Sequence, residues 1–199
     1  MSSSSSPLLL PDGHLILVAL DDELPTPKLL KHVTNGKRAI IGLGKINAAY
    51  HNLKIIQATR PRLLINFGTA GGLTDGVHEL VEVGSVVQRD MDLRTLGFPL
   101  GTTPFDPQPD EITLLETGVV CGTGDDFVHS PPEIACDIVD MELYAIAKIA
   151  VREGVPLRAF KYVSDKADES APADWKENLS KAADCFLHRL KTIDFDSYR

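Results

Sequence analysis

The sequence has few cysteines and no long apolar run, and each shortage excludes a class of protein. Its cysteines, Cys121, Cys136 and Cys185, are odd in number, and their spacings match no zinc knuckle or redox pair. We therefore expect no disulfide framework. We expect a reducing, cytoplasmic location instead. No apolar run approaches the roughly 20 residues that a transmembrane helix needs. We therefore do not expect the chain to cross a membrane.

Basic residues are also few relative to acidic residues. The chain has 20 lysines and arginines against 28 aspartates and glutamates, which gives a net charge of -8. No block of basic residues could follow a phosphate backbone. We therefore expect neither nucleic acid nor an anionic membrane surface as a partner.

The N-terminal segment differs in composition from the rest of the chain. Residues 1–12 hold a serine run and three consecutive leucines, without the basic segment of a secretion signal. We expect a flexible tail here. Residues 13–199 are predicted to form a single domain, since 43% of the whole chain is hydrophobic and its length suits one core.

Apolar runs of strand length alternate with helical patterns along this domain. Strands are predicted at residues 14–20, 37–43, 62–67, 84–89, 118–122 and 157–163, and helices at 45–60, directly after Glu142 and at 174–193. The alternation predicts an α/β fold with a mainly parallel central sheet flanked by helices. The small residues at 68–72 imply close backbone approach or positive φ, and taken alone this segment is interpreted as a tight strand-to-helix turn. The loop at residues 96–110 is interpreted as a lid or specificity element.

Acidic residues stand where predicted strands end. Glu23 follows the first strand, Asp140 and Glu142 follow a short apolar run, and Asp165 follows the last strand. Ligands of open α/β sheets bind outside the carboxyl ends of the strands, so these acids are candidates for chemistry. Simpler interpretations remain: Glu23 as a solvated acid, Glu142 as a residue favoured by the helix dipole, and Asp165 as a cap. Phe127 would more often be a core aromatic.

Seven short segments together form a recognisable pattern. They are residues 19–23 (ALDDE), 42–49 (GLGKINAA), 66–73 (NFGTAGGL), 83–87 (VGSVV), 123–128 (TGDDFV), 139–142 (VDME) and 164–168 (SDKAD). In this order the chain resembles the nucleoside phosphorylase and nucleosidase superfamily, particularly the 5′-methylthioadenosine/S-adenosylhomocysteine nucleosidases. The resemblance covers nearly the whole chain and implies the three-layer sandwich of the phosphorylase/nucleosidase type.

The resemblance also implies a reaction, namely cleavage of the N-glycosidic bond of a purine-type nucleoside. The sugar becomes oxocarbenium-like while the purine leaves as a poor anion, so carboxyl groups are needed on opposite sides of the bond. By position, Asp165 matches the general acid that protonates N7 of the base, and Ser164 the residue that orients it. Glu23 matches the acid that positions and deprotonates the attacking water. A raised pKa would suit Asp165 for this task.

Further residues match the family's substrate contacts. Glu142 matches the carboxylate that accepts hydrogen bonds from the ribose hydroxyls, and Met141 the side chain that lies against the sugar. Phe127 matches the residue that stacks on the base, while backbone groups of Phe127 and Val128 would read its edge. Gly71, in the glycine-rich segment, is a further substrate-binding candidate.

Whether water or phosphate attacks depends on one position. Phosphorylases of this superfamily carry an arginine two residues before the glycine that matches Gly68, and here that residue is Asn66. Without this cation phosphate loses an anchor, so hydrolysis is favoured. The alternatives are a phosphorylase that uses Lys161 or Arg94 for phosphate, and a non-catalytic nucleoside-binding homologue.

The resemblance implies no cofactor, and no histidine pairs with a cysteine at metal-ligand spacing, so no metal site is expected. The expected partners are a small-molecule nucleoside and further copies of this chain, in a dimer or a larger homo-oligomer. The interval between Glu23 and Gly42 is shorter than in typical members, where it helps to enclose the sugar 5′ group. The substrate is therefore left open between methylthioadenosine, S-adenosylhomocysteine and a modified-purine nucleoside.

Overall fold

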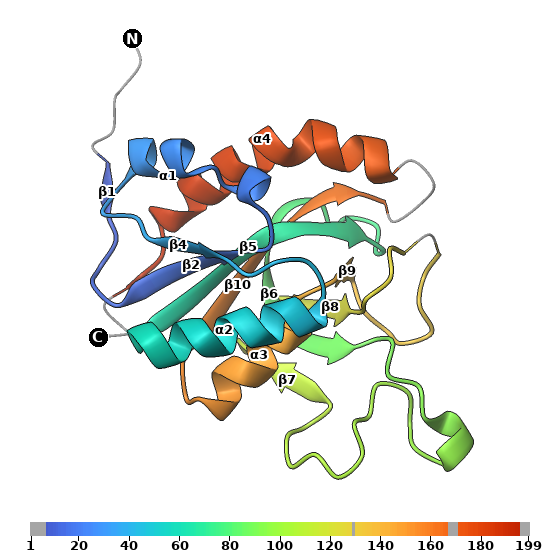
Figure 1. Ribbon diagram of the computed structural model, residues 1–199. Helices are drawn as coiled ribbons and strands as arrows, with labels where there is room; N and C mark the ends of the chain where they lie inside the picture. Colours follow the sequence, from blue (N-terminus) through green and yellow to red (C-terminus); the bar gives the residue numbers. More distant parts are fainter. Residues whose placement is uncertain (1–6, 129, 167–170, 196–199) are drawn as a thin grey trace.

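In the computed structural model, helices cover both faces of a central β-sheet (Figure 1). The structure describes residues 7–128, 130–166 and 171–195. One face is covered by α1 (Thr26–His32) and α4 (Ala171–Leu190), and the other by α2 (Lys45–Thr59) and α3 (Leu143–Arg152). The predicted α/β class and the helices on both faces are confirmed.

The central sheet contains eight of the described strands. They are β2 (His14–Val18), β4 (Arg38–Ile40), β5 (Leu63–Gly72), β6 (Glu79–Gln88), β7 (Glu111–Thr113), β8 (Val119–Thr123), β9 (Ile138–Asp140) and β10 (Leu157–Asp165). Their order is β10-β6-β8-β9-β5-β2-β4, with β7 beside β6. Because β10 also pairs with β5, five strands close into a barrel, from which β2 and β4 extend.

The prediction of a mainly parallel sheet is corrected by these pairings. β10 is antiparallel to β6, β9 to β5, and β7 to β6, whereas the remaining described pairs of this sheet are parallel. The sheet is therefore mixed. Apolar runs reveal that a strand is buried, but they do not reveal the direction of the neighbour with which it pairs.

The first described residues are held against the domain. Leu8–Leu9 form β1, which pairs in parallel with β3 (Val33–Thr34), and Leu10 is buried in the core. Of the residues predicted to form a flexible tail, 8–10 thus pack on the domain, while 1–6 lie outside the described residues.

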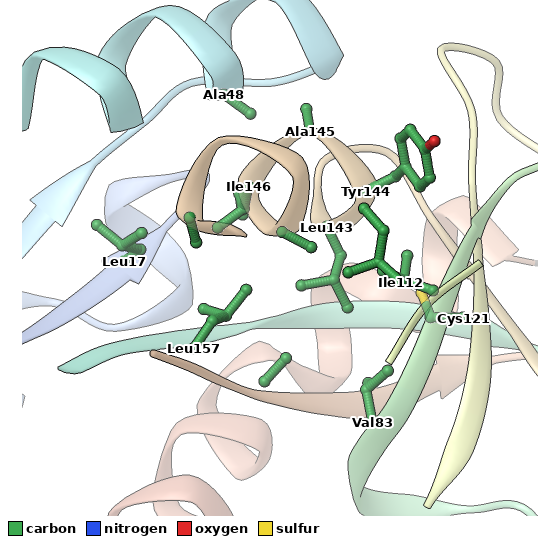
Figure 2. Close-up of a cluster of buried hydrophobic side chains, with 14 of the residues drawn as sticks. Leu17, Ala48, Val83, Ile112, Cys121, Leu143, Tyr144, Ala145, Ile146 and Leu157 are labelled. Atoms are coloured by element: carbon green, nitrogen blue, oxygen red, sulfur yellow. The ribbon is translucent and has the colours of Figure 1, made fainter. Parts of the chain in front are cut away.

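Two apolar layers hold the helices on the sheet. Figure 2 shows the first layer, in which Leu143 and Ile146 of α3 face Leu157 and Leu17 of the sheet. In the second layer, Phe186 of α4 stacks on Phe67 of β5, with ring centroids 4.2 Å apart. Since both faces are apolar, the strands between them read as continuous hydrophobic runs, as buried strands do.

The glycine-rich segment is part of a strand, so its interpretation as a strand-to-helix turn is wrong. β5 continues through Gly72. A Cβ at Gly68 would lie 3.0 Å from Glu23 Oε1 and 3.2 Å from Lys161 Nζ, and one at Gly72 would lie 2.7 Å from a methyl group of Val163. Glycine is present here because neighbouring side chains occupy the space above the strand.

A buried ion pair crosses the interior of the barrel. Lys161 of β10 is 1% exposed, and its Nζ lies 2.7 Å from Oδ2 of Asp140 at the end of β9. Burial opposes the charge of Asp140, but Lys161 outweighs it and lowers the pKa of that carboxyl. Burial also opposes the charge of Lys161, yet Asp140 and Glu142 raise its pKa. Thr123 of β8 donates a further hydrogen bond to Asp140.

We expect Lys161→Met to lower the free energy of unfolding by about 3–5 kcal/mol, because it leaves Asp140 buried without its cation. Urea denaturation followed by circular dichroism measures this loss. The control is Lys28→Met, since the pair between Lys28 and Asp184 is partly exposed and such pairs contribute about 0–1 kcal/mol. Equal losses in the two variants would contradict the importance of the buried pair.

Candidate active site

A cavity of about 230 Å³ lies at the ends of β5, β9 and β10. All the site residues predicted from the sequence line it: Glu23, Gly71, Phe127, Val128, Met141, Glu142, Ser164 and Asp165. The remaining lining residues are Ala19, Leu20, Leu43, Thr69, Ala70, Arg89, Asp126, Val139 and Asp140. Segments far apart in the sequence thus meet in one pocket.

Glu23 ends the short 3-10 helix η1 (Asp21–Glu23) and is buried. Its Oε2 accepts hydrogen bonds from the backbone N–H groups of Ala19 and Leu20, at 2.8 and 3.1 Å, and its Oε1 accepts one from Thr69 at 3.1 Å. Burial raises the pKa of Glu23, although Lys161 and these N–H groups oppose the rise. The result is a carboxylate with a fixed orientation and an increased affinity for a proton.

Glu142 precedes the first residue of α3 and reaches the start of another helix. Its Oε1 accepts a 2.9 Å hydrogen bond from the backbone N–H of Gly44, the residue before α2. Burial and the neighbouring Asp140 raise the pKa of Glu142 to about 7, against the effect of Lys161. Glu142 therefore changes its charge near neutral pH.

Asp165 and Ser164 form a pair at the end of β10. The pairing of β10 with β5 shifts register between Val163 and Asp165, and bulges of this kind redirect side chains beside active sites. Ser164 Oγ lies 2.7 Å from Oδ2 of Asp165, and the backbone carbonyl of Ser164 accepts a hydrogen bond from Asn178 of α4. Ser164 therefore connects the Asp165 carboxyl group to helix α4.

The apolar part of the cavity wall comes from two other segments. Phe127, which is 46% exposed, and the buried Val128 follow β8, while Met141 lies between β9 and α3. Val128 packs against Val139. A cavity lined by both apolar side chains and carboxyl groups suits a ligand that has both an aromatic ring and hydroxyl groups.

Two charged residues of the cavity wall, Arg89 and Asp126, are not among the site residues predicted from the sequence. Arg89 follows β6, is buried, and donates to Asp126 Oδ1 at 2.7 Å. Glu23 became a candidate because it is a charged residue at the end of a predicted strand. Arg89 meets the same criterion. It was missed because no segment of the resemblance includes it.

The two cations considered for phosphate binding are both engaged elsewhere. Lys161 is paired with Asp140, and it is absent from the residues described as lining the cavity. Arg94, in η2 (Arg94–Leu96), is paired with Asp92 and Glu133. Asn66 is buried and donates to the backbone carbonyl of Leu17.

The loop at residues 96–110 contributes none of the described lining residues of the cavity. Asp106 attaches it to α3 through ion pairs with Lys148, at 2.8 Å, and Arg152, at 2.9 Å. The interpretation of this loop as a lid or specificity element stays a prediction.

No three histidine, cysteine, aspartate or glutamate side chains within residues 7–128, 130–166 and 171–195 are arranged to hold a metal ion. No helix in the same ranges is both long and apolar enough to span a membrane.

Several proteins with a related sequence are nucleosidases. The 5′-methylthioadenosine/S-adenosylhomocysteine nucleosidase of Haemophilus ducreyi is 30% identical over 169 residues, which cover 72% of each chain. The nucleosidase of the same name from Geobacillus kaustophilus is 31% identical over 172 residues, or 71% of this chain and 72% of the relative.

Solved structures agree with this result. A Helicobacter pylori nucleosidase mutant with 5′-methylthioadenosine in its active site has a TM-score of 0.78 and 25% identity, covering 90% of this chain and 96% of that one. The futalosine hydrolase of Helicobacter pylori has a TM-score of 0.79 and 25% identity, covering 89% and 95%. The family model of the phosphorylase superfamily matches residues 31–193. With most of its length matched, the chain belongs to the phosphorylase superfamily, as the sequence motifs predicted.

Proposed function

We propose that this chain is a nucleoside N-ribohydrolase that cleaves the N-glycosidic bond of a purine-type nucleoside to give free base and a ribose derivative. One observation carries the proposal: Glu23, Glu142 and Asp165 line a single cavity together with the apolar side chains of Phe127, Val128 and Met141. The relatives named as nucleosidases support it. Release of a free base is a step of nucleoside catabolism and purine salvage.

Asp165 is the proposed general acid. The purine leaves as an anion unless a proton reaches its N7, and a carboxyl group beside the base can supply that proton. The contact between Ser164 Oγ and Asp165 Oδ2 would orient the carboxyl group toward the base. Phe127 would stack on the base, and the backbone of Phe127 and Val128 would bind its edge.

Glu23 is the proposed base for the attacking water. Its two oxygens are oriented by backbone N–H groups, so a water molecule bound to it would have a defined direction of attack. Its raised pKa suits a group that must take up a proton. Glu142 would accept hydrogen bonds from the ribose hydroxyls, and Met141 would contact the sugar face.

Hydrolysis is favoured over phosphorolysis by the arrangement of the cations. Asn66 takes the place of the phosphorylase arginine, and Lys161 and Arg94 are held by carboxylates. Arg89 lines the cavity, but its guanidinium is already bonded to Asp126 and to two backbone carbonyls. A phosphate ion would therefore find no uncommitted bidentate cation among the described lining residues. The non-catalytic alternative is disfavoured because the carboxyl groups for both sides of the bond are present.

A homo-oligomer is proposed from the surface beside the cavity. Leu43 lines the cavity and is 52% exposed, and Ile46 and Tyr50 on the same side of α2 are 82% and 59% exposed. Such a group of apolar side chains is typical of a protein interface. A cytoplasmic location stays a prediction and accords with three cysteines that form no disulfide.

We expect purified protein to release free base from methylthioadenosine or S-adenosylhomocysteine without phosphate, as measured by chromatography. Futalosine and other modified-purine nucleosides complete the panel. Asp165→Asn should lower kcat by at least about 100-fold, because the general acid is lost. Asp22→Asn changes an exposed acid beside Glu23 and serves as the matched control. Base release only in the presence of phosphate would contradict hydrolysis.

The ionisation of Glu142 should appear in the pH dependence of stability. Its folded pKa of about 7 exceeds its ordinary value of 4.5, so between these pH values the folded state binds more protons than the unfolded state. Stability should therefore fall as pH rises from 4.5 to 7, by up to about 1 kcal/mol per pH unit from this group. Denaturation of wild type and Glu142→Gln across this range measures the difference, and parallel curves would refute the assignment.

Association through α2 should be sensitive to charge. Ile46→Glu places a carboxylate in the apolar group, so we expect it to convert an oligomer into monomers in light scattering coupled to size-exclusion chromatography. Lys31→Glu, on α1 at the opposite face of the sheet, is the control. A wild-type monomer, or an oligomer that survives Ile46→Glu, would exclude this interface.

A further inference from the structure

We propose that Arg89 is a positioning residue for the purine base, because it holds the loop that carries Phe127. This loop, residues 124–128, connects β8 to the apolar wall of the cavity and is termed the base loop. This inference rests on the proposed function in one respect, namely that the purine base stacks on Phe127. The contacts that hold the loop are independent of that assignment.

Arg89 donates to three acceptors in the base loop. One terminal nitrogen bonds Asp126 Oδ1 at 2.7 Å, and the other bonds the backbone carbonyls of Asp126, at 2.5 Å, and of Gly124, at 3.3 Å. The residue is 8% exposed. A planar guanidinium can reach a carboxylate and two carbonyls at once, and such charge-assisted bonds are strong.

The backbone of the loop lies directly on this guanidinium. A Cβ added to Gly124 would lie 2.7 Å from Cζ of Arg89 and 2.8 Å from one of its terminal nitrogens. Glycine therefore permits this approach, because a larger residue would displace the guanidinium from its present position. The close contact explains how Arg89 reaches carbonyls on both sides of Asp125.

The next residue, Asp90, also holds the loop, but as a hydrogen-bond acceptor where Arg89 is a donor. Its Oδ2 accepts a 2.8 Å hydrogen bond from the backbone N–H of Asp125, and its Oδ1 accepts one from Lys45 Nζ. Asp125 in turn accepts a 2.7 Å bond from the backbone N–H of Lys45, the first residue of α2. Two consecutive residues after β6 thus bind the carbonyl and N–H groups of the base loop.

This attachment acts on the ligand through Phe127, which follows Asp126 directly. Its ring is 46% exposed and lines the cavity. A loop held in its binding conformation needs less ordering when a base is bound, which increases affinity. Arg89 therefore contributes to affinity for the base and not to breaking of the glycosidic bond.

The test compares Arg89→Met with wild type. We expect KM for the hydrolysed nucleoside to rise about tenfold, since several bonds to the loop are lost, with kcat changed less than about threefold. Arg89→Lys should restore part of the affinity, because it keeps the charge without the planar fork. Asp126→Ala, which leaves both backbone carbonyl bonds in place, should raise KM less than Arg89→Met. An unchanged KM in Arg89→Met would overturn the proposal.

Hydrogen–deuterium exchange separates this proposal from the proposed function. Amides of residues 124–128 should exchange faster in Arg89→Met than in wild type, while those of β8 keep their rate. If wild type cleaves no nucleoside, the proposed function fails, and the exchange result alone decides whether Arg89 holds the loop. Unchanged exchange in the loop would overturn it in either case. Should Arg89→Met fail to fold, Arg89→Lys provides the same measurements.

Discussion

The site depends on one buried cation placed among carboxylates. Lys161 crosses the barrel to Asp140 and also affects the ionisation of Glu23 and Glu142. Three buried carboxyl groups in so small a space would repel one another and bind protons without it. The closed barrel makes the arrangement possible, since β10 and β9 both pair with β5, and Gly68 of β5 leaves room for the Lys161 amino group beside Glu23.

Backbone groups provide the remaining support for the carboxylates. Glu23 accepts hydrogen bonds from the backbone N–H groups of Ala19, Leu20 and Thr69. Glu142 accepts one from the N–H of Gly44, the residue before α2. These donors belong to the main chain, so they are fixed by the fold itself and need no reorganisation when charge develops in a reaction. The same packing that forms the core therefore sets the geometry proposed for catalysis.

The base loop and the catalytic carboxylates are attached to the same framework by different means. Arg89 and Asp90 hold the loop from the end of β6, and Asp125 connects it to the start of α2. Glu142 contacts that same helix start through Gly44. The proposed sites for the base and for the ribose are thus joined through the N-terminus of α2.

The sequence by itself determined the position of several elements and identified eight of the residues that line the cavity. The predicted helix at 45–60 is α2 (Lys45–Thr59), and all eight predicted site residues line the cavity. Both results depend on local patterns: hydrophobic period along the chain, and short motifs in a known order. The prediction of a turn at residues 68–72 was wrong because a local pattern of glycines fits two structures. Glycines occur in turns, and they also occur where side chains closely approach a strand.

Only the tertiary structure decided how the strands pair and how the charges are matched. Closure of β10 on β5 and the antiparallel pairing of β10 with β6 join segments about 80 to 90 residues apart, beyond the reach of any local pattern. The ion-pair partners also depend on strand pairing: Lys161 of β10 meets Asp140 at the end of β9, and Arg89 after β6 meets Asp126 after the neighbouring strand β8. A sequence shows that a charge is present, but its partner depends on which strands become neighbours.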